Sequence, residues 1–239
     1  MIITGHQSEY LPYAGFFYKV QKSDKFIFVN HVQFQKEGFQ NRNKIRTGHG
    51  LGGWTWLTIP VITKNKLPQK INEVEIDNSR YWAKKHWKSI CLNYHKAPFF
   101  DEYKDFFEKI YLKKWEKLTD LNETIILYLF KELGIQVPIY KSSDYDFKGQ
   151  KTDLLIELCQ KFGVDTFLTG SGAKKPGVKS YVEEKKFKKN NLKHIFSDFK
   201  HPVYLQQFKP FVPNMSVIDL LFNCGPESKD IIINSAYDI

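Results

Sequence analysis

Side chains that can move protons or bind anions gather near the start of the chain, at residues 6–10. This segment holds an imidazole, an amide, a hydroxyl, a carboxylate and a phenol between Gly5 and Pro12. Imidazoles serve as general acids or bases, and amides offer fixed donor and acceptor pairs. We therefore predict an active-site loop in which His6 is catalytic and Gln7 and Tyr10 bind substrate. The residues leave open a plain turn whose histidine bonds a backbone carbonyl.

A second group of polar side chains follows the next apolar run. Residues 25–29 read KFIFV, which is typical of a buried strand, and the polar residues of 30–33 and 40–44 come after it. The carboxyl ends of neighbouring parallel strands line one crevice, so we expect both polar groups to meet there. The candidate catalytic residues of this segment are Gln33 and Arg42, and the candidate ligand-binding residues are Asn30 and Asn41.

A third candidate is the small-residue loop after the β-prone segment 165–169. Small residues let a backbone approach an anion closely, and lysines add positive charge. The loop matches neither the phosphate-binding G-x-x-x-x-G-K-[ST] pattern nor G-x-G-x-x-G, and a solvated turn remains the alternative. A capping box, Ser180 with Glu183, predicts a helix directly after it. The candidate ligand-binding residues are Gly170, Ser171, Gly172, Lys174, Lys175 and Tyr181.

Near the C-terminus, a short apolar helix is predicted from the N-cap Ser216 to the stop at Gly225. Asp219 and Asn223 lie four residues apart, so they share one face of this helix. They either point jointly at a ligand or anchor neighbouring backbone.

Composition restricts the partners and the compartment. The chain has 239 residues and a net charge of +10, which favours a polyanionic partner such as a nucleotide, a sugar nucleotide or RNA. The three cysteines, at positions 91, 159 and 224, show no paired spacing, so we expect neither a disulfide framework nor a metal site. No apolar run is long enough for a membrane span, and we expect a cytoplasmic protein.

The sequence patterns of the elements that must position these groups predict an α/β fold. Strand, polar loop and helix alternate at both ends of the chain, which indicates a mostly parallel, Rossmann-like sheet in which residues 2–4 and 25–30 form strands that are neighbours or near-neighbours. Residues 54–61 and 134–140 are further predicted strands. Apolar residues at helical spacing over 79–133 predict three helices, broken near Pro98 and after Lys114, that form a helical subdomain inserted in, or packed upon, the sheet. We treat residues 1–239 as one domain.

These motifs together resemble the WbqC-like protein family over nearly the whole chain. The residues that carry the resemblance are His6-Gln7-x-x-Tyr10-Leu11-Pro12-Tyr13-x-Gly15-Phe16-Phe17, Val32-Gln33-Phe34, Gln40-Asn41-Arg42-Asn43, residues 56–61, Thr169-Gly170-Ser171-Gly172 through Tyr181, and residues 216–225. The resemblance implies a protein of O-antigen and other surface-polysaccharide gene clusters. It also implies transfer of glycine or another acyl group to an amino sugar.

A more distant likeness concerns the nucleotidyltransferase-type fold of pantothenate synthetase and the cysteine ligase of bacillithiol synthesis. It rests on residues 26–34 and on the Gly5-His6 loop, and those relatives form amide bonds. By this likeness His6 would stabilise charge on a phosphate, while Gln33 and Asn30 would orient the acceptor or carboxylate.

We therefore expect an amide-forming acyl or aminoacyl transferase or ligase that acts on a nucleotide-linked amino sugar. ATP, acyl-CoA or aminoacyl-tRNA would serve as co-substrate, without a tightly bound cofactor. The alternative is a non-catalytic module that binds a nucleotide sugar or RNA for a partner enzyme.

Overall fold

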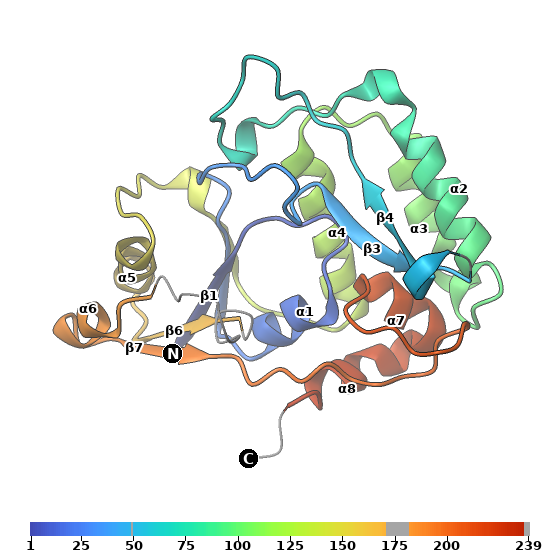
Figure 1. The fold of residues 1–239 in the computed structure, drawn as a ribbon. Helices are drawn as coiled ribbons and strands as arrows, with labels where there is room; N and C mark the ends of the chain where they lie inside the picture. Colours follow the sequence, from blue (N-terminus) through green and yellow to red (C-terminus); the bar gives the residue numbers. More distant parts are fainter. Residues whose placement is uncertain (49, 171–181, 237–239) are drawn as a thin grey trace.

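The structure, a computed structural model, describes residues 1–48, 50–170 and 182–236, and its centre is a parallel β-sheet (Figure 1). The strands of this sheet are β1 (Ile2–His6), β2 (Lys25–Phe28), β5 (Ile139–Lys141), β6 (Thr166–Thr169) and β7 (Lys193–Phe196), in the order β5-β2-β1-β6-β7. Every neighbouring pair is parallel, and β1 pairs with β2 from Ile3–Lys25 to His6–Phe28. The predicted α/β fold and the predicted first pair of strands are confirmed.

Helices cover both faces of this sheet. They are α1 (Ala14–Gln21), α2 (Trp82–Tyr94), α3 (Phe100–Leu112), α4 (Leu118–Glu132), α5 (Thr152–Lys161), α6 (Glu184–Lys189), α7 (Val217–Cys224) and α8 (Ser228–Ile233). In β2, Phe26 and Phe28 pack with α1 and α4, whereas Ile27 packs with α5 on the opposite face. Such double burial explains why the three residues after Lys25 in β2 are all apolar instead of alternating with polar residues.

The strand order reverses between β1 and β6. The chain builds the sheet outward from β1 through β2 to β5, and then returns to place β6 on the other side of β1. Backbone pairing of β1 with β6 runs from Ile2–Thr166 to Ile3–Phe167, although both strands continue beyond it. Further along, the Thr4 hydroxyl donates to the Leu168 carbonyl at 2.8 Å. Ligands of open α/β sheets bind beyond the carboxyl ends of strands at such a reversal.

The long helical pattern corresponds to α2, α3 and α4, which lie together on one side of the sheet (Figure 1). Their buried residues, among them Ile90, Phe107 and Ile125, belong to the same apolar cluster as Phe16 of α1 and Phe26 of β2. The helical block is therefore packed against the sheet through a continuous core. None of the helices within the described ranges is long and apolar enough to cross a membrane.

The structure differs from the expected local structure at two places. No strand was predicted over residues 40–44, but β3 (Arg42–Arg46) pairs with β4 (Trp54–Thr58) in an antiparallel hairpin. In β3 only Ile45 is a buried apolar side chain, so the alternating pattern that marks a strand is missing. Residues 134–140 were expected to be strand, whereas β5 begins only at Ile139, directly after Pro138, which has no N–H to donate.

Candidate functional site

His6 is the last residue of β1 and lies at the reversal of strand order. Its side chain is 27% exposed and packs edge-on against Phe16, with ring centroids 5.0 Å apart. Nδ1 lies 3.0 Å from the Gln7 carbonyl oxygen. Because a carbonyl only accepts, Nδ1 carries the hydrogen, and in the neutral ring Nε2 then presents a lone pair. His6 can therefore accept a hydrogen bond from a ligand.

Glu9 and Lys19 accompany His6, and the sequence had not singled them out as site residues. A Glu9 carboxylate oxygen lies 3.8 Å from His6 Nδ1, and Lys19 Nζ donates to the Gly5 carbonyl at 3.1 Å. Lys19 is 3% exposed because it projects from the inward face of α1 beneath the loop. A lysine between Phe16 and Val20 on an apolar helix face was the signal that could have identified it.

Burial brings two of these groups into the neutral pH range. It raises the pKa of Glu9 to about 7, against a smaller opposing effect of Lys19. It also lowers the pKa of Lys19 to about 7, with Glu9 opposing. Burial and the charge of Lys19 lower the pKa of His6 to about 3, so the imidazole is neutral at pH 7. Such displacements are common at sites of proton transfer.

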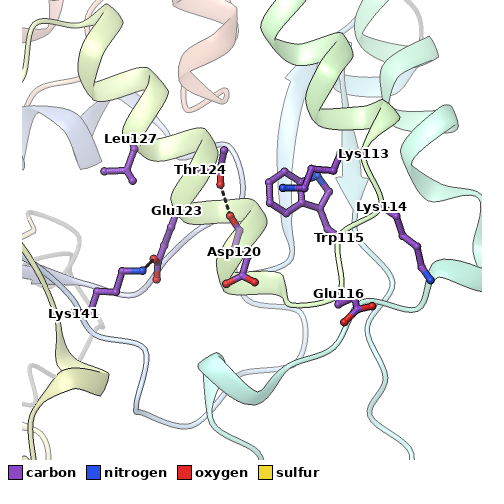
Figure 2. Close-up of a pocket in the computed structure, with 9 residues that line it drawn as sticks. All are labelled: Lys113, Lys114, Trp115, Glu116, Asp120, Glu123, Thr124, Leu127 and Lys141. Atoms are coloured by element: carbon purple, nitrogen blue, oxygen red, sulfur yellow. Dashed lines mark hydrogen bonds and ion pairs between the residues drawn. The ribbon is translucent and has the colours of Figure 1, made fainter.

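Asn30 holds the loop in place after β2 rather than presenting a free amide. Its Oδ1 accepts from the Ser8 backbone N–H at 2.9 Å, and its Nδ2 donates to Glu123 at 2.7 Å. Glu123 also forms an ion pair with Lys141 at 2.6 Å. Figure 2 shows this pair at one side of a pocket of about 500 Å³ that α4 and the segment before it line. Asn30 thus connects the His6 loop to α4.

Amide side chains also tie the His6 loop to the start of β3. Gln40 donates to the Gln7 side-chain oxygen, and Asn122 donates to the carbonyls of Ser8 and Gln40 at 3.1 and 2.7 Å. Gln7 is the only one of these amides that was predicted as a ligand-binding residue. These bonds fix the backbone on which His6 and Glu9 are mounted.

The structure places Arg42 on the outer face of the β3–β4 hairpin. Its guanidinium lies 4.5 Å from the Trp56 ring centre, and Lys44 lies 4.1 Å from that of Trp54. Asn41, just before β3, is buried and donates to the Ile59 carbonyl at 2.9 Å. Among the residues that the structure describes, no hydrogen bond or ion pair joins Arg42 or Asn41 to His6.

Three other predicted residues are engaged inside the protein. Tyr10 is fully buried, and its hydroxyl bonds His86 and Tyr111 of the helical layer. Asp219 is fully buried and accepts from Tyr94, Tyr204 and Gln206 at 2.9, 2.7 and 2.7 Å, and burial raises its pKa. Asn223 donates to the Asp219 carbonyl. Of the two interpretations of Asp219 and Asn223, these contacts correspond to anchoring.

The remaining predicted residues lie apart from these clusters or outside the described ranges. Gln33 is exposed and forms a single antiparallel bridge with Lys70. Gly170 directly follows β6, so it lies at the same end of the sheet as His6. The predicted residues Ser171, Gly172, Lys174, Lys175 and Tyr181 lie outside the described residues, as does Ser180 of the predicted capping box. In the described ranges no group of three His, Cys, Asp or Glu side chains is arranged to hold a metal ion.

Fold and site together describe an α/β protein with a polar cluster at the strand reversal, and comparison with known proteins assigns its family. The model of the WbqC-like protein family matches residues 7–231, so the chain belongs to that family. The uncharacterized protein Rv1507c of Mycobacterium tuberculosis is 35% identical over 228 residues, which cover 95% of each chain. No solved structure matches the chain. The likeness to pantothenate synthetase and the bacillithiol ligase therefore stays a prediction.

Proposed function

We propose that this protein forms an amide bond between an activated acyl or aminoacyl group, such as glycyl, and the amine of a nucleotide-linked amino sugar. The observation that carries the proposal is the cluster of His6, Glu9 and Lys19 at the reversal of strand order. Membership of the WbqC-like family supports a role alongside polysaccharide gene clusters. The donor would be acyl-CoA, aminoacyl-tRNA or an acyl group activated by ATP, and the reaction would take place in the cytoplasm.

Each member of the cluster supplies one requirement of amide formation. The sugar amine must be neutral to attack, so a group with a pKa near 7 has to accept its proton. Glu9 meets this requirement. The lone pair on His6 Nε2 can accept a hydrogen bond from the amine and orient it. A neutral imidazole fits this role better than the phosphate-binding role that the distant likeness implies. The ammonium of Lys19, which lies below the loop, interacts electrostatically with the Glu9 carboxylate.

The experiment that tests the proposal is a transfer assay read by mass spectrometry. UDP- and dTDP-linked amino sugars are incubated with acetyl-CoA, with glycine and ATP, or with glycyl-tRNA, and the amide product is detected by its mass. His6→Ala should lower turnover about a hundredfold or more and leave the melting temperature near that of the wild type, because the side chain is partly exposed at the carboxyl end of β1.

The matched control is His95→Ala, which removes an exposed histidine directly after α2 whose ring bonds the Cys91 carbonyl. This control should turn over as the wild type does. Absence of product from every combination in the wild type would count against the proposal. Wild-type turnover in folded His6→Ala would remove the imidazole from the mechanism.

A second candidate function is a non-catalytic module that binds a nucleotide sugar or RNA, and the outer face of the β3–β4 hairpin favours it. There Arg42 and Lys44 alternate with Trp54 and Trp56, and Phe39 beside them is 49% exposed. Aromatic rings with interleaved cations stack bases and neutralise phosphates. Tryptophan fluorescence during titration with UDP-sugars and single-stranded RNA tests it: Trp56→Ala should weaken binding about tenfold, since one stacked base contributes ~1–3 kcal/mol.

A further inference from the structure

Three side chains at the end of β6 form a hydrogen-bonded chain that the cluster around His6 does not include. Thr169 Oγ1 lies 2.7 Å from His194 Nε2, and His194 Nδ1 lies 2.6 Å from a carboxylate oxygen of Glu184. The His194 side chain is fully buried, whereas that of Glu184 is 53% exposed at the start of α6. Hydroxyl, imidazole and carboxylate thus stand in the order found in hydrolases and acyltransferases with a nucleophilic hydroxyl.

The bonds determine where the protons lie. A carboxylate only accepts, so Nδ1 of His194 must carry the hydrogen that the Glu184 bond uses. In neutral imidazole Nε2 is then the acceptor, and the Thr169 hydroxyl must donate to it. This is the protonation pattern in which the base is poised to take the proton of the attacking hydroxyl.

The sheet explains how residues so far apart in sequence meet. In the β6–β7 ladder Phe167 pairs with His194, so Thr169, two residues further along β6, lies diagonally opposite on the same face. The rings of Phe187 and Phe196 pack on the imidazole, with centroids 5.2 and 4.6 Å away, and hold its orientation. Thr169 ends β6 at the same end of the sheet as His6, but its side chain lies on the face that α5 and α6 cover, whereas the His6 ring packs on Phe16 of the opposite face. An acyl group on Thr169 and an amine at His6 therefore have to meet beyond the carboxyl ends of β1 and β6.

We propose that Thr169 is a nucleophile that carries the acyl group as an ester, with His194 as its base and Glu184 as the residue that positions His194. This inference rests on the proposed function and names its intermediate. Thr169 Oγ1 attacks the carbonyl of an activated acyl donor, a thioester or acyl adenylate, and its proton passes to His194 Nε2. The tetrahedral intermediate collapses, and the C–S or C–O bond to the leaving group breaks. His194 returns the proton to a thiolate, whereas an adenylate leaves as the anion and its proton goes to solvent.

The second half of the reaction uses the amine. The sugar amine attacks the ester carbonyl and gives a proton to His194 Nε2. The C–O bond to Thr169 then breaks, the amide forms, and His194 passes this proton to Thr169 Oγ1. Thr169 is 8% exposed, and shielding of this kind protects an ester from hydrolysis until the amine arrives.

The test uses the full chain and p-nitrophenyl acetate as the acyl donor, with no amino sugar present. We expect a burst of p-nitrophenolate of about one equivalent per protein, because acylation outpaces deacylation. An acetyl group should appear on the peptide that contains Thr169, and hydroxylamine should remove it, as it does from an ester and not from an acetylated lysine. Thr169→Val should abolish the burst and the labile adduct, and Thr169→Ser should retain both.

Two further variants separate chemistry from folding. Thr166→Val removes a hydroxyl of the same strand that bonds Asp165, and it should acylate as the wild type does. Glu184→Gln changes a half-exposed side chain and should slow acylation about a hundredfold, because the amide no longer enforces the His194 tautomer. If Thr169→Val fails to fold, Thr169→Ser and Glu184→Gln decide in its place.

Acetylation confined to lysines, or an unchanged burst in folded Thr169→Val or in Glu184→Gln, would overturn the inference. An ester on Thr169 without transfer to any amino sugar would contradict the proposed function and leave this inference standing. Transfer to an amino sugar without an ester on Thr169 would support the proposed function and overturn this inference.

Discussion

Glu9 and Lys19 are ionisable side chains that the fold removes from water beside His6. Desolvation penalises the charged form of each, so the pKa of the acid rises and that of the base falls until both lie at about 7. Each opposes the other's displacement by its charge. Because their pKa values coincide, small changes of charge near the loop will move a proton between them.

The pH dependence of turnover should report Glu9. Below pH 7 the carboxyl is protonated and cannot accept the amine proton, so the rate should rise as the pH passes through about 7. Glu9→Gln should lower the rate about a hundredfold and flatten this rise, since the variant has no carboxylate to form. Rates measured from pH 5 to 9 for both proteins check this. Equal rates at every pH would show that Glu9 is not the base.

Lys19→Met should stabilise the protein, most of all in acid. The pKa of Lys19 is lowered from 10.5 to about 7, so between these values the unfolded chain binds the extra proton and stability rises with pH. Below pH 7 the folded protein bears the full cost of the buried charge. At pH 6 the variant should gain on the order of 2 kcal/mol in the free energy of unfolding, and the gain should shrink toward pH 10.

Urea unfolding at pH 6 and pH 10 measures this gain. The exposed Lys22, directly after α1, provides the control, and Lys22→Met should change stability by less than about 0.5 kcal/mol. A loss of stability in Lys19→Met at both pH values would show that the Lys19 bond to the Gly5 carbonyl outweighs desolvation.

At the scale of elements, Arg46 is the side chain that joins the β3–β4 hairpin to the chain before α7. It is buried, and its guanidinium donates to the carbonyls of Thr47, Gly53, Phe208 and Pro210 and to the side chain of Gln206. Gln206 in turn donates to Asp219 of α7. Asp219 thus belongs to the structural support of the hairpin.

Arg46→Lys should therefore lower the free energy of unfolding by roughly 2–4 kcal/mol. Lysine offers one point charge in place of a planar fork, so several buried carbonyls lose their donor. Guanidinium unfolding measures the change, with Arg80→Lys as the control because Arg80 pairs with Asp77 at the surface. An equal, small change in both variants would contradict the network.

The elements that the sequence predicts are those with a strong periodic pattern. Helices α2, α3 and α4 follow from apolar residues at helical spacing, and β2 follows from an unbroken apolar run. Strand β7 carries no such pattern, because it lies at the sheet edge with Lys193 and Ile195 exposed. Helix α6 begins at Glu184 with Glu183 as its N-cap, three residues later than a capping box of Ser180 and Glu183 implies.

The sequence predicts only part of the site, for a related reason. The cluster of polar types around His6 is local in sequence, and so is the strand that ends there. The approach of Lys19 depends on how α1 packs against β1, and the meeting of Thr169 with His194 depends on the register of β6 and β7. Such contacts are set by tertiary structure, which one sequence does not display.

The molecule as a whole is a parallel sheet with helices on both faces (Figure 1). The proposed reaction takes place at the carboxyl ends of its strands. The pocket beside α4 is a separate place, lined by residues such as Trp115 and Asp120 (Figure 2). The face of the β3–β4 hairpin that carries Trp54 and Trp56 is a third surface that could bind a ligand. The position of a bound ligand therefore shows which of these three surfaces is the binding site.

A crystal structure of the protein with a UDP-linked amino sugar tests the central claim most directly. The account predicts that the sugar amine lies within hydrogen-bond distance of His6 Nε2, with the nucleotide across the carboxyl ends of β1 and β6. Binding in the pocket beside α4, or on the β3–β4 face, with the ends of β1 and β6 unoccupied would contradict it.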